Sequence, residues 1–339
     1  MMKSFKVAVY GATGHTGRFV VAELERRGVD IRRISRQVVA QQDGASEAWA
    51  TASCDDPDAL DQALKGVGAV INCAGPFLDT APAIVEAALR VGAHYFDVAA
   101  EQRSVRQTLA TYNAEAADRG IVVLPAMAFY GGLADLLAAR VCTGMHSVEE
   151  ILIAVGLDHW HPTAGTRRTG ERNTARRFIV SEGRLTPLPV ESQRRWCFPL
   201  PFGDLAVTAV PLSEIVTISR HIAAKRIESF MNEAPLQDLS RTNTPPPTST
   251  EPNGKSSQTF VMDVVASGDG TSRRIAAFGN DIYAVSAPLV VEACMRVLQR
   301  PVKGGTFAPA ELFDAEDFLA ALKSEIRVQS MSQSPPVSG

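Results

Sequence analysis

Residues 5–17 read FKVAVYGATGHTG, and this stretch decides how the chain folds. The run from Phe5 to Tyr10 is apolar and β-branched, which predicts a β-strand. After the glycine-rich turn, Val20 and Leu24 repeat at helical spacing and Gly28 follows as a stop signal. The stretch therefore predicts a strand, a tight turn and a helix in direct succession.

The turn carries three glycines, each with a separate use. Gly11 allows the tight turn, Gly14 allows close approach of a ligand to the backbone, and Gly17 allows the helix to pack closely on the strand. Unpaired N–H groups at the start of the helix would then face a diphosphate. The predicted diphosphate-binding residues are Gly11, Thr13, Gly14, His15, Thr16 and Gly17.

The end of the second predicted strand, residues 30–35, selects between the two nicotinamide dinucleotides. A carboxylate there would bind the ribose hydroxyls of NAD, but the chain has Ser35 and Arg36, with no acidic residue before Asp43. The forked guanidinium of Arg36 suits a 2′-phosphate, so we expect NADP, with NAD less favoured. The alternative is that Arg36 stacks on the adenine or faces water.

A second glycine-bearing turn follows the strand of residues 68–72 and reads NCAGPF. It opens at the same end of the predicted sheet, where small residues let the backbone approach the nicotinamide ribose. Without a ligand it is simply a turn that ends a strand. We expect cofactor contacts from this turn and from the end of the weak third strand: Ser53, Cys54, Asn72, Cys73, Ala74, Gly75, Pro76 and Phe77.

Short strands alternate with helical segments over the first 125 residues. Further strands are expected at 47–52, 94–98 and 121–124, with a helix after Asp56 and another that opens at Thr80 and Pro82. Strands connected by helices run parallel with right-handed crossovers. The pattern predicts an α/β fold of the Rossmann type, with a doubly wound parallel sheet and ligand sites at the carboxyl ends of its strands.

The regular alternation of predicted strands and helices ends after Pro125. Strands are expected at 151–155 and 260–265 without regular helices between them, and a polar, proline-rich loop at 240–257 has nothing to bury. A helix resumes at 288–298, and Asp314 is expected to cap a last helix. We expect the tail, residues 328–339, to be disordered.

Composition excludes several classes of protein. The chain has 339 residues, 45% of them hydrophobic, and 34 basic against 37 acidic residues, so no basic field favours nucleic acid. No apolar run approaches the roughly 20 residues of a membrane-spanning helix, and the start lacks a signal-peptide core. Five scattered cysteines form no C-x-x-C pair. We expect a cytoplasmic protein without a membrane span, a metal site or disulfides.

Several motifs, taken in order, resemble the saccharopine dehydrogenase-like family, with its trans-acting enoyl reductase branch nearest in length. The motifs are GATGHTG, the Ser35-Arg36 pair, NCAGPF, HYFDVAAE (94–101), GGLADLL (131–137), FGNDIYAVSAPLVVEA (278–293) and GGTFAPAEL (304–312). The resemblance is thinnest between residues 167 and 250. The chain departs from the family pattern at Ala100, which replaces the glycine before Glu101, and in the setting of Asp135.

The resemblance implies a domain organisation and an activity. It implies a dinucleotide-binding domain over residues 1–130, joined by a C-terminal helix at 310–327, and an α+β substrate domain with a mixed sheet over residues 131–309. That second domain is expected to cover the nicotinamide and to be the dimerisation domain of a homodimer. The implied activity is NADP-dependent hydride transfer.

Candidate groups for proton transfer are Tyr283, Tyr130, Glu101 and His94, although tyrosines are more often packed than catalytic. Candidate substrate contacts are Arg167, Arg168 and His159. If residues 165–177 are helical, Arg168, Arg172 and Arg176 form a stripe that could bind an anionic substrate, or equally a solvated helix face. His159 and His161 have no spaced third ligand, so a metal is not expected.

Two functions remain open from the sequence. The first is an NADP-dependent oxidoreductase that acts on a C=N or activated C=C bond of a small-molecule or carrier-bound substrate. The second is a catalytically silent NADP-binding sensor or scaffold, because a fold does not guarantee activity. The sequence does not choose between imine and enoyl substrates.

Overall fold

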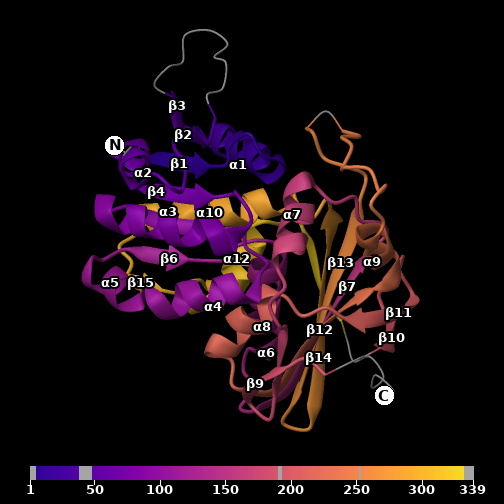
Figure 1. The fold of residues 1–339 in the computed structure, drawn as a ribbon. Helices are drawn as coiled ribbons and strands as arrows, with labels where there is room; N and C mark the ends of the chain where they lie inside the picture. The colour runs from indigo at the N-terminus through magenta and orange to yellow at the C-terminus, as the bar shows by residue number, and fades with distance from the viewer. Residues whose placement is uncertain (1–4, 38–47, 190–192, 252, 332–339) are drawn as a thin grey trace. The chain divides into compact units, whose positions relative to one another are not determined.

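The computed structural model describes residues 5–37, 48–189, 193–251 and 253–331 (Figure 1). The chain divides into two compact units. Unit 1 comprises residues 1–128 and 286–307, and unit 2 comprises residues 129–285 and 308–339. Each unit is built around its own sheet.

Unit 1 contains a parallel sheet of seven strands in the order β15-β6-β5-β4-β1-β2-β3. From β1 the strand order continues to β2 and β3 on one side and to β4, β5 and β6 on the other. Doubly wound sheets bind their ligands at this switch point, which lies between β1 and β4. The expected Rossmann-type fold is confirmed. The strands are β1 (Lys6–Tyr10), β2 (Asp30–Ser35), β3 (Trp49–Thr51), β4 (Ala69–Asn72), β5 (His94–Asp97), β6 (Val122–Leu124) and β15 (Gly305–Thr306).

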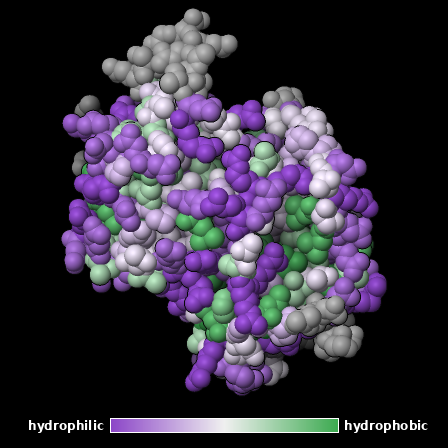
Figure 2. Space-filling model, viewed as in Figure 1, coloured by the Kyte–Doolittle hydropathy of each residue, from purple (hydrophilic) through white to green (hydrophobic). Residues whose placement is uncertain are grey.

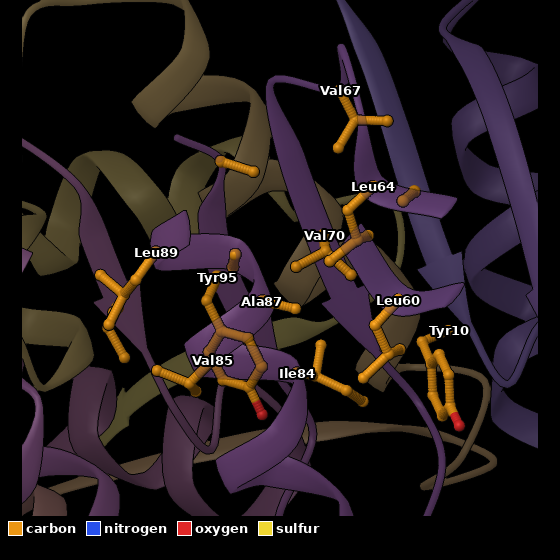
Figure 3. Packing of buried hydrophobic residues seen from close by; sticks show 14 of the residues in the cluster. Tyr10, Leu60, Leu64, Val67, Val70, Ile84, Val85, Ala87, Leu89 and Tyr95 are labelled. Atoms are coloured by element: carbon orange, nitrogen blue, oxygen red, sulfur yellow. The ribbon is translucent and has the colours of Figure 1, made fainter. Parts of the chain in front are cut away.

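Helices pack on the sheet of unit 1 in pairs, α2 against α3 and α1 against α10. Figure 3 shows part of the core between the sheet and the first pair, where Leu60, Val70, Ile84 and Tyr95 pack together. The visible surface of this unit is predominantly hydrophilic (Figure 2). The helices are α1 (His15–Arg26), α2 (Pro57–Leu64), α3 (Phe77–Val91), α4 (Gln102–Thr111), α5 (Asn113–Asp118) and α10 (Ser286–Gln299).

Helix α3 begins earlier than the sequence predicts. Its first residue is Phe77, and Pro82 lies inside the helix although we expected it at the opening. The helix starts at once after the 72–77 turn because a buried carboxylate, described below, accepts the Phe77 N–H. By contrast, Asp56 caps α2 as expected, with its carboxylate 3.0 Å from the Ala59 nitrogen.

Unit 2 contains a mixed sheet whose main path is β10-β11-β12-β7-β13-β14-β16. Only β12 and β7 pair in parallel along this path. Helices α6 and α8 pack against each other, α6 on β13 and β14 and α8 on β12. The strands are β7 (Val148–Leu157), β8 (Phe178–Ser181), β9 (Arg184–Pro187), β10 (Gln193–Cys197), β11 (Asp204–Ala209), β12 (Ala224–Asn232), β13 (Thr259–Gly268), β14 (Thr271–Asn280) and β16 (Arg327–Met331).

The remaining elements of unit 2 are helical and short. They are the π-helix η2 (Phe129–Leu133), α6 (Ala134–Cys142), α7 (Ala164–Arg172), α8 (Ser213–His221), α9 (Glu233–Ser240), α11 (Pro309–Leu312) and α12 (Ala315–Ala321). Asp314 caps α12 as expected. The described part of the proline-rich stretch after α9 contains no helix or strand before Thr259.

The C-terminal elements are distributed differently from the expectation. The expected single helix over 310–327 is replaced by α11, α12 and the start of β16. These elements belong to unit 2, whereas α10 and β15 belong to unit 1. The prediction of disorder from Val328 onward is wrong for residues 328–331, because β16 pairs with β14 from Arg327 opposite Phe278 to Met331 opposite Arg274. The rest of the predicted tail, 332–339, lies outside the described residues.

Among the described helices, none is long and apolar enough to cross a lipid bilayer.

Candidate functional site

The glycine turn of unit 1 is held by its own backbone. Gly11 adopts a φ of 80°, a conformation that side chains other than glycine rarely take. Its N–H donates to the Ile34 carbonyl at the end of β2 (2.9 Å), and the Gly14 N–H donates to the Gly11 carbonyl (2.9 Å). The turn is therefore fixed between β1, β2 and α1.

A side chain would be crowded at each of the three glycines, most severely at Gly17. A Cβ atom at Gly17 would lie 2.1 Å from the Gly11 carbonyl oxygen, one at Gly14 would lie 3.1 Å from the same oxygen, and one at Gly11 would lie 3.0 Å from the Ala74 Cβ. Position 17 is the tightest, because the neighbour is backbone and has no side-chain rotamer to change. The predicted roles of the glycines in close packing thus have a geometric basis.

The N-terminus of α1 is open to an anion. The helix begins at His15 after Gly14, which provides no side-chain cap, and the first turn carries no acidic residue. The first N–H groups of a helix lack intrahelical acceptors and carry partial positive charge, so a diphosphate fits here. Thr13 and Gly14 are exposed beside this helix end, Thr16 and Gly17 lie in its first turn, and the His15 ring meets Phe19 edge-on at 5.3 Å.

At the end of β2, the three arginines differ in their partners. Arg32 donates to two backbone carbonyls and Arg33 pairs with Glu25. Arg36 is exposed, and no described residue forms a hydrogen bond or ion pair with its guanidinium. Ser35 is buried, and its hydroxyl donates to a neighbouring carbonyl. Of these three arginines, Arg36 thus has a guanidinium without a described partner. It is also the residue that the sequence assigns to a 2′-phosphate.

Side-chain hydrogen bonds hold the turn after β4 in place. The Ala74 N–H donates to the Asn72 side-chain oxygen (3.0 Å), and the Thr80 hydroxyl donates to the Ala74 carbonyl (2.6 Å). Asn72 in turn donates to Thr80 and to the Tyr95 hydroxyl. The Gly75–Pro76 peptide bond is cis. The turn thus presents a fixed backbone at the carboxyl end of the sheet, at the switch point between β1 and β4.

Glu101 fastens the same turn. Its carboxylate accepts the Phe77 N–H (3.0 Å) and the Ala100 N–H (3.2 Å), and the residue is 2% exposed. Burial raises its pKa. Because both oxygens accept backbone N–H groups, Glu101 is placed to position Phe77 and the turn. His94, another proton-transfer candidate, accepts the Val122 N–H (3.0 Å) at its Nδ1 atom.

Asp97 has a similar structural role that the sequence analysis missed. It is fully buried and accepts N–H groups from Ala99 (2.9 Å) and Ala126 (2.7 Å) and the hydroxyl of Tyr95 (2.8 Å). Burial raises its pKa to about 6. The signal was present in the sequence, since an acidic residue at the end of an apolar strand requires partners.

The predicted cysteine and serine contacts lie in this region of unit 1. The Cys54 sulfur is 3.1 Å from the Tyr10 hydroxyl, and Ser53 lies beside Asp55. Burial raises the pKa of the Cys54 and Cys73 thiols, so neither is activated as a thiolate.

In unit 2, Tyr283 is part of a hydroxyl cluster. Its oxygen accepts the Trp160 indole N–H (2.8 Å), lies 2.8 Å from the Thr166 hydroxyl, and is 3.4 Å from the Thr163 nitrogen. The cluster ties the start of α7 to the segment after β7. Tyr283 is thus held by several partners.

Tyr130 is held differently. It lies in η2, is 9% exposed, and its hydroxyl has no hydrogen-bond partner among the described residues. The same holds for the Ser213 hydroxyl and for the Oε2 atom of Glu214, two fully buried residues that the sequence analysis did not single out. No motif marks them, because a serine and a glutamate at a helix start normally indicate a cap.

The two arginines on α7 that are predicted to contact substrate have different surroundings. Arg167 donates to backbone carbonyls of the proline-rich stretch, among them that of Thr244 (2.9 Å), while Arg168 is exposed. The expected stripe is wrong, because α7 ends at Arg172 and Arg176 therefore does not continue the helix. The chain leaves the helix after Asn173, whose N–H bonds back to Thr169.

The histidine pair is close together but has local partners. The His159 ring lies 4.6 Å from the His161 ring, and its Nδ1 atom is 2.9 Å from Asp158. Within the described ranges, no group of three metal-ligating side chains occurs.

Asp135, fully buried, pairs with His221 (2.7 Å) and accepts the Ala310 N–H (2.7 Å).

Comparison with known proteins gives three findings. Residues 7–124 match the family model of the saccharopine dehydrogenase NADP binding domain. A human saccharopine dehydrogenase-like oxidoreductase is 29% identical over 156 residues (40% of this chain, 36% of the relative), and a putative trans-acting enoyl reductase of Mycobacterium tuberculosis is 28% identical over 144 residues (40% and 34%). The matched stretches thus span little more than a third of either relative's length.

The fold also matches a solved structure over almost its whole length. Saccharopine dehydrogenase (L-Glu forming) from Saccharomyces cerevisiae superposes with a TM-score of 0.67 and 13% identity, covering 97% of this chain and 100% of that one. An identity this low shows the fold alone. The fold, the glycine turn with its available arginine and the matched model agree. Residues 7–124 thus match a saccharopine dehydrogenase NADP binding domain, and the chain is similar to saccharopine dehydrogenase-like oxidoreductases.

Proposed function

We propose that the chain is an NADP-dependent oxidoreductase that transfers hydride between the nicotinamide and a C=N or activated C=C bond of a small-molecule or carrier-bound substrate. The observation that carries this proposal is the closely packed turn at Gly11, Gly14 and Gly17, which opens onto an uncapped helix end and is followed along the sheet by the unpaired Arg36. The names of the human and mycobacterial relatives support an oxidoreductase, and the latter supports an enoyl substrate.

The residues of unit 1 would bind and orient the cofactor. The N–H groups of the first turn of α1 would hold the diphosphate, and Arg36 would hold the 2′-phosphate. Bound NADPH supplies the hydride. The turn that Glu101 and Asn72 fasten would fix the ribose of the nicotinamide, because its backbone has little freedom to move.

The residues of unit 2 would contact the substrate. We assign a hydrogen bond to the substrate to Tyr130, because its buried hydroxyl has no described protein partner to compete with. Tyr283 is assigned to positioning, because its hydroxyl already serves Trp160 and Thr166. Phe129 meets the Tyr130 ring edge-on at 5.0 Å and fixes its orientation.

The test is turnover by the full chain, followed as loss of NADPH absorbance. One panel contains 2-oxo acids paired with amines, which form imines, and a second contains enoyl thioesters. We expect oxidation of NADPH with at least one panel, and a fall in kcat/KM of about tenfold or more in Tyr130→Phe, because this variant loses a hydrogen bond to the substrate. A control variant, Tyr112→Phe in unit 1, should keep the activity of the parent chain.

A silent sensor would give a different result. It would bind NADPH with the same preference over NADH but turn over neither panel. Such a result would reject the enzyme while leaving the nucleotide site intact.

A further inference from the structure

Three buried polar atoms of unit 2 lack a partner within the described chain: the Tyr130 hydroxyl, the Ser213 hydroxyl and the Glu214 Oε2 atom. Tyr130 is 9% exposed, Glu214 1% and Ser213 not at all. Buried polar groups in native proteins almost always have a hydrogen-bond partner, and leaving one unpaired costs free energy. Three together require an explanation.

The three atoms belong to one place in the fold. Tyr130 lies on η2, and Ser213 and Glu214 are the first two residues of α8. Helix α8 packs directly on η2, where the Thr217 hydroxyl donates to the Gly131 carbonyl (3.2 Å). Tyr130 and Glu214 are close enough for their charges to interact.

A cation joins this group. Arg177 directly precedes β8 (Phe178–Ser181), which packs against α8. This places Arg177 where its charge can act on Glu214 and Tyr130, and burial lowers its pKa. The residue as a whole retains exposed surface, and its guanidinium forms no hydrogen bond or ion pair with any described residue. The cluster therefore joins buried, unpaired hydroxyls to a guanidinium that has no described partner.

The chemistry of the four side chains selects one ligand group. Two hydroxyls and a guanidinium are donors, and their natural common acceptor is a carboxylate. We propose that Tyr130, Ser213, Glu214 and Arg177 form a subsite of unit 2 that binds the carboxylate group of a ligand. As the subsite for a substrate it rests on the proposed function, whereas carboxylate binding itself does not.

Glu214 makes this binding depend on pH. One of its oxygens accepts the Leu212 N–H (2.8 Å). Burial raises its pKa to about 7, against the opposing effects of that N–H, of the nearby Ser229 hydroxyl and of Arg177. Protonated Glu214 donates a further hydrogen bond to the ligand, while ionised Glu214 repels it. Carboxylate binding should therefore be strong below pH 7 and weaken as the pH rises through 7.

The other charged groups near α8 have partners of their own. Asp135 on α6 pairs with His221, and Glu311 on α11 pairs with Arg220. On β12, Arg226 pairs with Glu228 and Lys225 pairs with Glu149.

Tyr283 interacts with Tyr130 but stays protonated, because burial raises its pKa. His221, whose pKa is also raised, lies at the opposite end of α8 from Glu214. Among the four subsite residues, Glu214 is the one whose pKa lies near 7, so its titration changes the charge of the subsite.

The experiment uses the full chain without cofactor and three probes of equal length: hexanoate, hexanamide and hexylamine. Binding is measured by calorimetry at pH 6 and pH 8. We expect hexanoate to bind most tightly, with an affinity roughly tenfold higher at pH 6 than at pH 8, as titration of one group with a pKa near 7 requires. Glu214→Gln should remove this pH dependence and retain binding. Arg177→Met should weaken binding at least about tenfold at both pH values.

Arg184→Met, which removes an exposed arginine of β9, is the matched control and should bind hexanoate as the parent chain does. Two results would overturn the subsite: a preference for hexylamine, or hexanoate binding that Arg177→Met leaves unchanged. Absence of hexanoate binding at both pH values would also overturn the subsite. Because NADPH binding is measured separately, failure of the subsite is distinguishable from failure of the proposed function. Far-UV circular dichroism confirms that each variant is folded.

Discussion

The two candidate sites are built from different parts of the chain. In unit 1 the groups left open are backbone N–H groups at the start of α1, and the side chains around the 72–77 turn have partners. In unit 2 the open groups are side chains, on η2, on α8 and before β8. A backbone site requires small residues in a fixed order, whereas a side-chain site requires only that the fold bring distant residues together.

The largest expected effect concerns the polar groups of unit 2 that do have partners. Asp263 is fully buried and accepts N–H groups from Arg274 (2.9 Å) and Trp196 (2.8 Å). Arg274→Met leaves that carboxylate without its cation and should lower the free energy of unfolding by about 3–5 kcal/mol, measured by urea denaturation. Arg273→Met, at an exposed neighbouring position, should change it by less than about 1 kcal/mol. Equal effects would contradict the assignment of Asp263 as a buried, paired charge.

The next largest effect tests the backbone site. Gly17→Ala places a methyl group 2.1 Å from the Gly11 carbonyl oxygen, so the turn must shift. We expect a loss of about 1–3 kcal/mol in stability and an NADPH affinity at least about 100-fold lower. The control is Gly170→Ala on α7, where no atom lies within 4 Å of the new Cβ. Undiminished NADPH affinity in Gly17→Ala would show that the turn does not bind the diphosphate.

Removing an unpaired buried hydroxyl should leave the free energy of unfolding unchanged or raise it, whereas removing a paired one should lower it. Tyr130→Phe deletes a buried group without a described partner, so stability should be unchanged or rise by up to about 1 kcal/mol. Tyr283→Phe leaves the Trp160 indole N–H without its acceptor and should cost about 1–3 kcal/mol. Thermal and urea unfolding measure both. If Tyr130→Phe is the more destabilising, the Tyr130 hydroxyl has a partner in solution.

The smallest effect concerns pH. Burial alone would lower the pKa of His221, but its hydrogen bond and charge interaction with Asp135 raise it above the ordinary value. The resulting stabilisation is fully present below about pH 6.5, the unfolded pKa, and is lost as the pH rises through the folded pKa. The stability difference between the parent chain and His221→Asn should therefore shrink between pH 6 and pH 9. NMR titration of His221 checks the direction, and a folded pKa below 6.5 would refute it.

The sequence predicted most of the fold and the nucleotide site because both are encoded locally. The glycine spacing of 11–17 and the strand-helix alternation before residue 125 follow short-range rules. The start of α3 was missed because a distant residue, Glu101, accepts the Phe77 N–H. Strand β16 was missed because its sequence, RVQSM, has few apolar residues and forms only against β14.

The side-chain cluster of unit 2 was beyond sequence analysis for a related reason. Tyr130 was a candidate because of its chemistry, but Ser213, Glu214 and Arg177 lie far from it in the chain and follow no motif. Tyr130, Ser213 and Glu214 are distinguished by polar atoms that lack partners after burial, a property that exists only in three dimensions.

The most direct test of the account is calorimetric titration of the full chain with NADPH and with NADH. We predict that NADPH binds at least about tenfold more tightly, equivalent to about 1.4 kcal/mol, and that Arg36→Ala removes most of this difference while NADH binding stays the same. Arg103→Ala, at an exposed arginine of α4, should retain the full preference. Equal dissociation constants for the two cofactors in the parent chain would contradict the central claim that the uncapped start of α1 and Arg36 together bind NADP.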